Sequence, residues 1–298
     1  MLSDALVVDN ESLVNNPART LCSVERARSE RRAIAVESIG TRPESLSLLP
    51  LIEPDILVLA PELADCEPTT ASARALHVLA AQAERTGAVI VASGIDSEIQ
   101  RTRALAMGAT FGIGALFAPA TPDECPHEFA GGALPPPTWS TPFASTTSPF
   151  SIASSDTFAT SSTKKLLIEM STHIEFQAAC SGADTMALGT FQHARQFSTR
   201  TRRRWRTMAD RIAYTGVYGV AMNDLSDSGL THSGLAPDDP LVDEWNIVVL
   251  GQFYCCVLSA RDQHCGTSEL DRRFDYVLSH DRGTVVRCAR AILSRFDG

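Results

Sequence analysis

The chain of 298 residues carries a formal net charge of −9, with 44% hydrophobic and 20% charged residues. This composition is typical of folded globular proteins and excludes wholesale disorder and a coiled coil. The length predicts two domains, and no apolar run approaches the roughly 20 residues of a membrane span. The first ten residues lack the basic-then-apolar order of a secretory signal, so we expect a cytoplasmic protein with no membrane partner.

The basic residues exclude two classes of function. Of the 26 basic residues only Lys164 and Lys165 are lysines, so no lysine-dependent chemistry is available before them. The net charge is −5 over residues 1–118, −4 over 119–163 and 0 over 164–298. A duplex-binding protein needs a clustered excess of Lys and Arg, so we expect no nucleic-acid partner. The eight cysteines form no C-x-x-C pair, and the sequence predicts no metal and no cofactor.

Short apolar runs alternate with helical patterns in the first part of the chain. Strands are predicted at residues 5–8, 33–36, 56–59, 88–92 and 108–117, and helices at 16–31, 44–49, 70–85 and 97–107. Near-continuous apolar strands that alternate with helices predict an α/β parallel sheet, either open or part of a barrel. The pattern supplies about four and a half βα units, fewer than the eight of a closed barrel.

The middle of the chain is rich in proline. Eight of the sixteen prolines fall between Pro119 and Pro149, and Ser and Thr dominate the residues that follow. This composition predicts a linker over residues 119–160, between a domain at 1–118 and a second domain at 161–298.

The second domain combines several strands with flanking helices. Strands are predicted at residues 185–189, 217–222, 246–250, 253–260 and 274–279, and helices at 163–179, 201–213 and 283–295. Strands bunched between helices predict an α+β domain with a mostly antiparallel sheet.

Two segments of the first domain resemble the C-terminal half of an EAL domain. They are RAIAVESIGTRPESLSLLPLIEPDILVLAPEL, residues 32–63, and ERTGAVIVASGIDSEIQRTRALAMGATFGIGALFAP, residues 84–119. EAL domains are TIM-barrel phosphodiesterases for cyclic di-GMP, so the resemblance implies a partial TIM-barrel-like (βα) half domain. The family's E-A-L segment, which begins the barrel, is absent because the chain starts after it; we expect a short native half or a misplaced start.

The resemblance also implies which residues stand at the family's catalytic positions. Where the family has two adjacent metal-binding aspartates, a lysine, an aspartate, a glutamate and a further acid, this sequence has Glu37, Ser38, Val58, Ala60, Ser93 and Asp96. Catalysis in the family uses two metal ions about 3.5–4 Å apart. Glu37 and Asp96 cannot hold such a pair alone, so we expect a degenerate site and no enzyme activity.

Half a barrel leaves a physical problem. Its sheet exposes a strand edge and part of an apolar interior. We expect two half-barrels to form a homodimer, or the linker and second domain to cover the gap.

Four segments of the second domain resemble the DICT family, a sensory domain found in bacterial signalling proteins beside EAL and diguanylate cyclase domains. They are TKKLLIEMSTHIE, LGTFQHARQFSTRTRRRWRTMA, DDPLVDEWNIVVLG and RRFDYVLSHDRGTVVRCARAIL, between residues 163 and 293. The resemblance implies an α+β sensory domain that responds to a small ligand or to a protein partner.

Candidate binding residues gather in this second domain. Phe191, Gln192 and Trp245 are candidates for a ligand pocket, since Gln192 offers a polar contact beside two aromatic rings; packing in the core is the alternative for the rings. Arg195 begins a run of basic residues that continues with Arg200, Arg202, Arg203, Arg204 and Arg206. One interpretation is a helix face that is solvated or paired with acids, and residues 238–244 are then its acidic counterpart. The other is a site that binds an anion or a partner.

Together these expectations describe a non-catalytic signalling regulator. The EAL-like half acts as a dimerisation or docking platform, and the DICT-like domain senses a ligand or partner. The first alternative is an effector that binds cyclic di-GMP without hydrolysing it, and the second is a residual phosphodiesterase.

Overall fold

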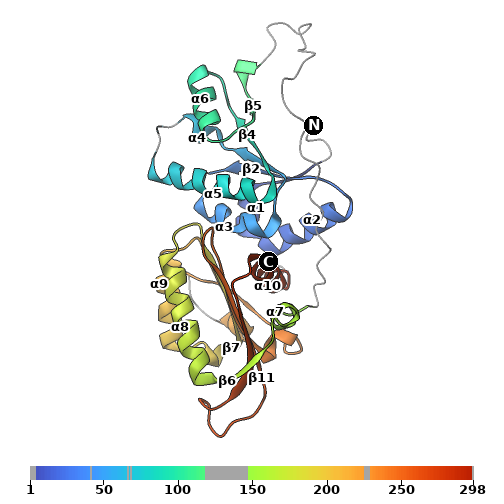
Figure 1. Ribbon diagram of the computed structural model, residues 1–298, viewed down its shortest axis with the longest axis vertical. Helices are drawn as coiled ribbons and strands as arrows, with labels where there is room; N and C mark the ends of the chain where they lie inside the picture. The colour runs from blue at the N-terminus through green and yellow to red at the C-terminus, as the bar shows by residue number, and fades with distance from the viewer. Residues whose placement is uncertain are drawn as a thin grey trace. The chain divides into compact units, whose positions relative to one another are not determined.

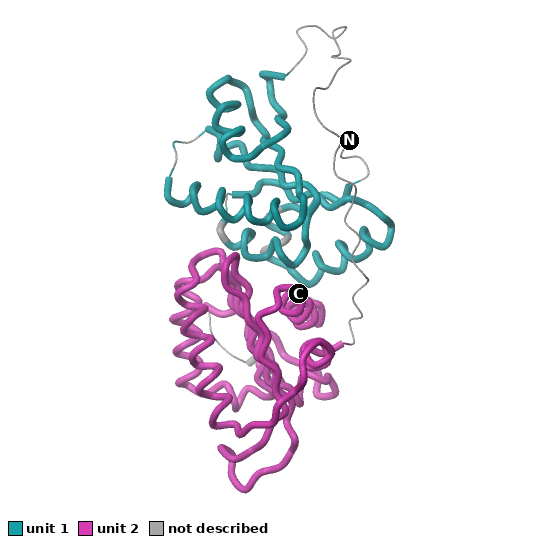
Figure 2. Tube along the Cα trace, in the orientation of Figure 1, with its two compact units in different colours: residues 1–142 teal, residues 143–298 magenta. Residues whose placement is uncertain are grey.

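The computed structural model describes residues 5–40, 42–65, 67, 69–117, 147–224 and 229–296. The chain divides into two compact units, residues 1–142 and residues 143–298, which Figure 2 distinguishes by colour. Each unit has its own sheet, so each is described by itself. No helix in the described ranges combines the length and the apolar character needed to cross a bilayer.

Unit 1 is built on a parallel sheet whose five strands lie in sequence order (Figure 1). The strands are β1 (Leu6–Val8), β2 (Ile34–Ile39), β3 (Ile56–Leu59), β4 (Val89–Ser93) and β5 (Phe111–Ile113). The helices are α1 (Asn10–Asn15), α2 (Pro17–Ser29), α3 (Pro43–Ile52), α4 (Pro61–Asp65), α5 (Thr70–Thr86) and α6 (Glu98–Ala106), with the 3-10 turn η1 (Ala115–Phe117). Successive parallel strands joined by right-handed crossovers are the arrangement of a TIM barrel, which confirms the predicted partial barrel.

The structure adds one helix to the first predicted part of unit 1 and shortens one of its strands. The helix predicted at 16–31 is α2, which begins where Asn16 accepts a hydrogen bond from the N–H of Arg19 at 3.0 Å, with Pro17 in its first position. Helix α1 precedes it and was not predicted. The strand predicted at 108–117 pairs only along β5. A Cβ at Gly114 would lie 2.2 Å from the Ile95 carbonyl oxygen, so the chain turns there in close contact with the preceding loop.

A buried ion pair joins three parts of unit 1. One carboxylate oxygen of Asp55 accepts hydrogen bonds from Arg28 Nη1 at 2.6 Å and from the backbone N–H of Ile34 at 2.7 Å. Arg28 Nη2 also donates to the carbonyl oxygen of Glu53 at 2.7 Å. These contacts tie α2 to the turn before β3 and to the start of β2. The pair persists in the interior because hydrogen bonds satisfy both charges.

Unit 2 has a mixed seven-stranded sheet in the order β6-β12-β11-β10-β7-β8-β9. The strands are β6 (Thr160–Thr163), β7 (Met186–His193), β8 (Tyr214–Val220), β9 (Thr231–Gly234), β10 (Glu244–Leu250), β11 (Cys255–Asp262) and β12 (Arg273–Ser279). Pairing is antiparallel from β6 to β7, and β8 and β9 continue in parallel. The mostly antiparallel α+β domain predicted from the sequence is confirmed, with a parallel edge.

Helices cover both faces of this sheet (Figure 1). They are α7 (Pro149–Asp156), α8 (Lys164–Cys180), α9 (Thr199–Ala209) and α10 (Arg282–Leu293), and the short 3-10 turns are η2 (Ala194–Gln196), η3 (Met222–Asp224) and η4 (Pro240–Asp243). Helices α8 and α9 pack against each other over one face, and α7 and α10 pack against each other and against β10 and β11. The core beneath α8 and α9 includes Trp205, Ile247 and Leu258.

Helix α7 lies inside the range 119–160 that the composition predicts as linker; residues 118–146 fall outside the described residues. The helix begins where Ser148 accepts a hydrogen bond from the N–H of Ser151 at 3.2 Å, and Pro149 takes the first position. It buries Phe150 and Ile152 in unit 2. Eight residues with two buried apolar side chains are too weak a periodic signal to stand out in a Ser- and Pro-rich segment.

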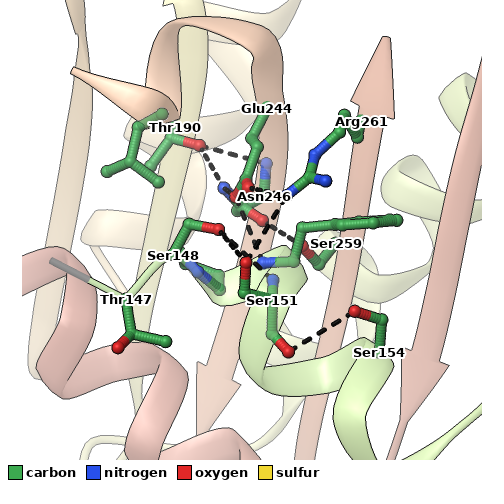
Figure 3. A network of polar contacts seen from close by, with 12 residues as sticks. Thr147, Ser148, Ser151, Ser154, Thr190, Glu244, Asn246, Ser259 and Arg261 are labelled. Carbon is green, nitrogen blue, oxygen red and sulfur yellow. Dashed lines mark hydrogen bonds and ion pairs between the residues drawn. The ribbon is translucent and has the colours of Figure 1, made fainter. Parts of the chain in front are cut away.

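A polar network holds the start of α7 on the sheet (Figure 3). Glu244 is only 1% exposed, and one of its carboxylate oxygens accepts a hydrogen bond from the N–H of Phe150 at 3.1 Å. Asn246 Nδ2 donates to the same oxygen at 3.3 Å, and Arg261 Nη2 donates to the other at 3.4 Å. The guanidinium of Arg261 also lies 4.3 Å from the centre of the Phe150 ring. The carboxylate on β10 is therefore the anchor of α7.

Candidate functional site

The six positions matched to EAL catalytic residues lie on β2, β3 and β4 of unit 1 or in the loops that leave them. Glu37 and Ser38 are exposed on β2, where the pairing with β3 shifts register. Ser38 has a positive φ of 55°. Val58 and Ala60 are buried. The carboxyl end of β3, between those of β2 and β4, is therefore apolar.

The two remaining positions form hydrogen bonds with nearby backbone groups. Ser93 Oγ donates a hydrogen bond to the Leu59 carbonyl oxygen at 2.6 Å, joining β4 to β3. Asp96 Oδ1 accepts from the N–H of Ala115 at 2.7 Å, which holds η1 against the loop after β4. Across the described ranges, His, Cys, Asp and Glu side chains form no group of three or more that could hold a metal ion.

The second candidate site is a pocket of about 700 Å³ in unit 2. Helix α8, the start of α9, strands β7, β10 and β12 and the residues before β12 contribute to its lining. Phe191, Gln192, Arg195 and Trp245, which the sequence analysis names as candidates, all line it. The structure thus brings these four side chains together.

Strand register explains how Phe191, Gln192 and Trp245 come to line one pocket. Phe191 on β7 lies directly opposite Trp245 on β10, so both face the layer of α8 and α9. Gln192 follows Phe191 and lines the same pocket because the pairing of β7 with β8 is irregular between Thr190 and His193, and such irregularities re-aim side chains. Phe191 also packs against Phe197, with ring centroids 4.8 Å apart, so it serves the core and the pocket wall together.

A buried carboxylate on α8 contacts the middle of α9. Glu175 on α8 accepts hydrogen bonds from Arg204 Nε at 2.5 Å and from the indole N–H of Trp205 at 3.1 Å. Burial raises the pKa of Glu175, although these hydrogen bonds and the charge of Arg204 oppose the shift. Arg204 is thereby turned toward α8. The acidic counterpart predicted at 238–244 is wrong for this reason, and in that stretch Asp239 pairs with Arg295 and Glu244 with Arg261.

A second charge network closes the other side of the pocket. Arg272 forms ion pairs with Asp262 and, at 3.1 Å, with Glu269, which also pairs with Lys164. The hydrogen bond from Lys164 lowers the pKa of Glu269. Burial acts to raise the pKa of Asp262, but the hydrogen bonds from Arg272 and from the backbone of His264 bring it below its usual value. The sequence analysis missed Glu175, Arg272 and Lys164, because only the fold brings α8 and the segment before β12 to β7.

The comparisons with known proteins agree with both resemblances. The model of the family described as "EAL domain" matches residues 5–120, and the model of DICT, "Sensory domain in DIguanylate Cyclases and Two-component system", matches residues 151–263. The chain carries a short EAL domain followed by a DICT sensory domain. Both families named from sequence motifs are therefore confirmed.

One solved structure similar to the chain is that of Vibrio cholerae LapD, described as "S helix-GGDEF-EAL (apo)". The identity is 16%, the TM-score is 0.34, and the match covers 37% of this chain and 27% of that chain. The chain thus spans about a quarter of the length of that structure. No curated protein matches the sequence.

Two carboxylates of the DICT pocket should respond to pH with opposite sign. The pKa of Glu175 is raised above 4.5 in the folded protein. The folded protein therefore loses stability as the pH rises from 4.5 through this raised pKa, and Glu175→Gln removes the loss. The lowered pKa of Glu269 gives stability that is present above 4.5 and lost as the pH falls through the folded value, and Glu269→Gln removes this gain. As the pH rises, unfolding free energy relative to wild type should therefore increase for Glu175→Gln and decrease for Glu269→Gln.

Urea unfolding followed by tryptophan fluorescence, repeated between about pH 3.5 and 7, measures both differences. The Glu269→Gln effect should be the smaller, because solvent screens its exposed pair with Lys164. Slopes of the same sign for the two variants would contradict the electrostatic account of the pocket.

Proposed function

We propose that the protein is a non-catalytic signalling regulator, in which the DICT pocket senses a ligand and the EAL half serves as a dimerisation platform. The observation that carries this proposal is the arrangement of β10. Its residue Trp245 lines the pocket, and the preceding residue Glu244 holds the first turn of α7 on the opposite face of the sheet. Helix α7 follows the proline-rich segment that comes after the EAL domain. A change in the pocket can therefore reach the helix that follows the proline-rich segment.

The residues at the EAL strand ends support the non-catalytic part of the proposal. Hydrolysis in this family needs carboxylates that converge on two metal ions. Val58 and Ala60 offer no ligand atom or proton, and Ser93 donates its hydroxyl proton to a backbone carbonyl. Asp96 retains an acid but accepts a backbone hydrogen bond. What these positions do instead is hold adjacent strands and turns together.

The edges of the EAL sheet support the dimerisation part. Both edge strands carry exposed apolar side chains, with Val7 41% and Ile113 53% exposed, and Phe117 after β5 is 46% exposed. The apolar cluster that includes Ile56 and Val91 is already buried, so the exposed edges are what a partner can cover. A second copy of the same half offers matching strand edges, since isologous contacts are self-complementary.

The pocket and α7 can influence each other through strand alternation. Neighbouring residues of a strand project to opposite faces, so a ligand that displaces the Trp245 ring rotates the backbone that carries Glu244. The carboxylate then changes its hydrogen bond to Phe150. Because Glu244 is buried, the N–H of Phe150 has no nearby water to replace a lost acceptor. We infer that α7 reports the state of the pocket.

Purified protein supplied with Mg²⁺ or Mn²⁺ should release no linear dinucleotide from cyclic di-GMP above the buffer background. The reason is that only Glu37 and Asp96 remain at the carboxylate positions. Chromatography of the reaction products measures this, with an active EAL phosphodiesterase as the positive control. Product that disappears in Glu37→Gln would overturn the non-catalytic proposal. Saturable heat in calorimetry with cyclic di-GMP would support the alternative of a binding effector, and the absence of heat would remove it.

Light scattering of the full chain should give the mass of a dimer, and hydrogen exchange should show protection of residues 5–8 and 111–117. The variant Ile113→Arg should dissociate the dimer, because it places a charge on the apolar edge of β5. The matched control is Leu105→Arg on α6, whose side chain is also exposed, at 58%. This control should leave the dimer intact. A monomeric wild-type protein with unprotected strand edges would refute the dimerisation platform.

Hydrogen exchange of residues 150–156 tests the relay. Glu244→Gln should raise this exchange roughly tenfold, because a hydrogen bond to a charged acceptor is stronger than one to a neutral acceptor. Trp245→Phe, which alters only the pocket side of β10, should change the exchange of the same residues. The control is Glu269→Gln, because Glu269 lines the pocket but does not lie on β10. This variant should leave the exchange of residues 150–156 unchanged. Unchanged exchange in Trp245→Phe, beside the expected rise in Glu244→Gln, would contradict the relay.

A further inference from the structure

The DICT pocket carries two guanidinium groups that have no acidic partner among the residues the structure describes. Arg195 on η2 and Arg200 in the first turn of α9 are exposed, and neither forms an ion pair with any described residue. The other cations of the lining, Lys164, Arg204 and Arg272, are each paired with Glu175, Asp262 or Glu269. Charge is thus compensated at Lys164, Arg204 and Arg272, whereas Arg195 and Arg200, near the start of α9, have no acidic partner among the described residues.

A free hydrogen-bond donor lies beside these arginines. Gln192 is 8% exposed, and its side-chain oxygen accepts from Gln196 Nε2 at 2.9 Å and from Arg272 Nη2 at 3.5 Å. Its Nε2 atom donates to no partner among the residues that the structure describes. The oxygen contacts hold the amide in place, so the amide nitrogen is a fixed donor on a pocket-lining side chain.

Aromatic and apolar side chains make up another part of the lining. Trp245 and Phe274 meet edge to face with ring centroids 6.3 Å apart, and Ile168 and Leu270 add aliphatic surface. A volume of about 700 Å³ falls within the roughly 300–1,000 Å³ of small-molecule sites. Apolar walls with a few convergent polar groups favour a small, largely unsaturated molecule over a bare ion.

We propose that the DICT pocket binds a small organic anion with a flat apolar body. Its carboxylate or phosphate group pairs with Arg195 and Arg200, an acceptor atom receives the Gln192 amide proton, and its ring lies against Trp245. Arginine suits this role because its planar donors match carboxylate and phosphate oxygens in pairs. Among the lining carboxylates, Glu175 and Glu269 are neutralised by the protein, and the exposed Glu169 is outnumbered by Arg195 and Arg200, so the pocket favours an anion over a cation. This assignment rests on the sensory function proposed above and names the chemical class of its ligand.

The test uses two fluorescent probes that share one skeleton and differ in charge. The anion is 1-anilinonaphthalene-8-sulfonate, and the neutral probe is N-phenyl-1-naphthylamine. The full chain should bind the anion saturably at one site, and Arg195→Gln and Arg200→Gln should each weaken this binding about tenfold, since each removes one charge-assisted contact. Arg203→Gln, an exposed arginine on the same helix outside the lining, should leave it unchanged. The neutral probe should be insensitive to all three substitutions.

Anion affinity that is equal in the wild type and both pocket variants, or no saturable binding by the folded wild type, would overturn the assignment. Circular dichroism checks that each variant remains folded. Displacement by benzoate and by phenyl phosphate then distinguishes carboxylate from phosphate as the recognised group, and failure of both at large excess also counts against the proposal. The sensory function fails separately: bound anion with no change in the exchange of residues 150–156 would leave the site standing and remove the relay.

Discussion

The DICT domain depends on one buried carboxylate in the middle of its sheet. Glu244 is removed from water and has to be compensated within the protein, because an uncompensated buried charge is very costly. The compensation comes from Asn246 on the same strand, from Arg261 on β11, and from the backbone of α7. A segment that would otherwise belong to a polar linker is thereby fastened to the domain. The same strand carries Trp245 on its other face, so the anchor and the pocket share one backbone.

Polar side chains hold together the packing of the EAL domain. Asp55 still forms its buried pair with Arg28 and caps the start of β2, and Ser93 and Asp96 bind backbone groups of neighbouring segments. These interactions require polar atoms in fixed places but no metal. A sheet held in this way keeps two unpaired strand edges with exposed apolar side chains, which is what the proposed interaction platform needs.

The pocket of the DICT domain combines satisfied and unsatisfied charge. Glu175 neutralises Arg204, and Asp262 and Glu269 neutralise Arg272, which keeps both arginines in fixed positions at low electrostatic cost. Arg195 and Arg200 remain available near the start of α9. Because the ion pairs of Arg204 and Arg272 fix part of the lining, the site is preorganised, and Arg195 and Arg200 can still pair with a charged ligand. The fold therefore separates the groups that build the pocket from those that can recognise something in it.

The sequence by itself determined most of the strands and helices, both families, and the candidate residues Phe191, Gln192, Arg195 and Trp245. Apolar periodicity and family motifs are local, so they survive without knowledge of the fold. The tertiary structure alone decided that Glu175 and Arg272 reach this pocket, that Arg204 pairs with Glu175, and that α7 belongs to the DICT domain. It also added β6 and β9, whose polar sequences TSST and THSG become strands only by pairing with β12 and β8. The physical reason is common to all of these: each depends on a contact between residues far apart in the chain, and no local pattern encodes which distant partner a charge or a strand edge will meet.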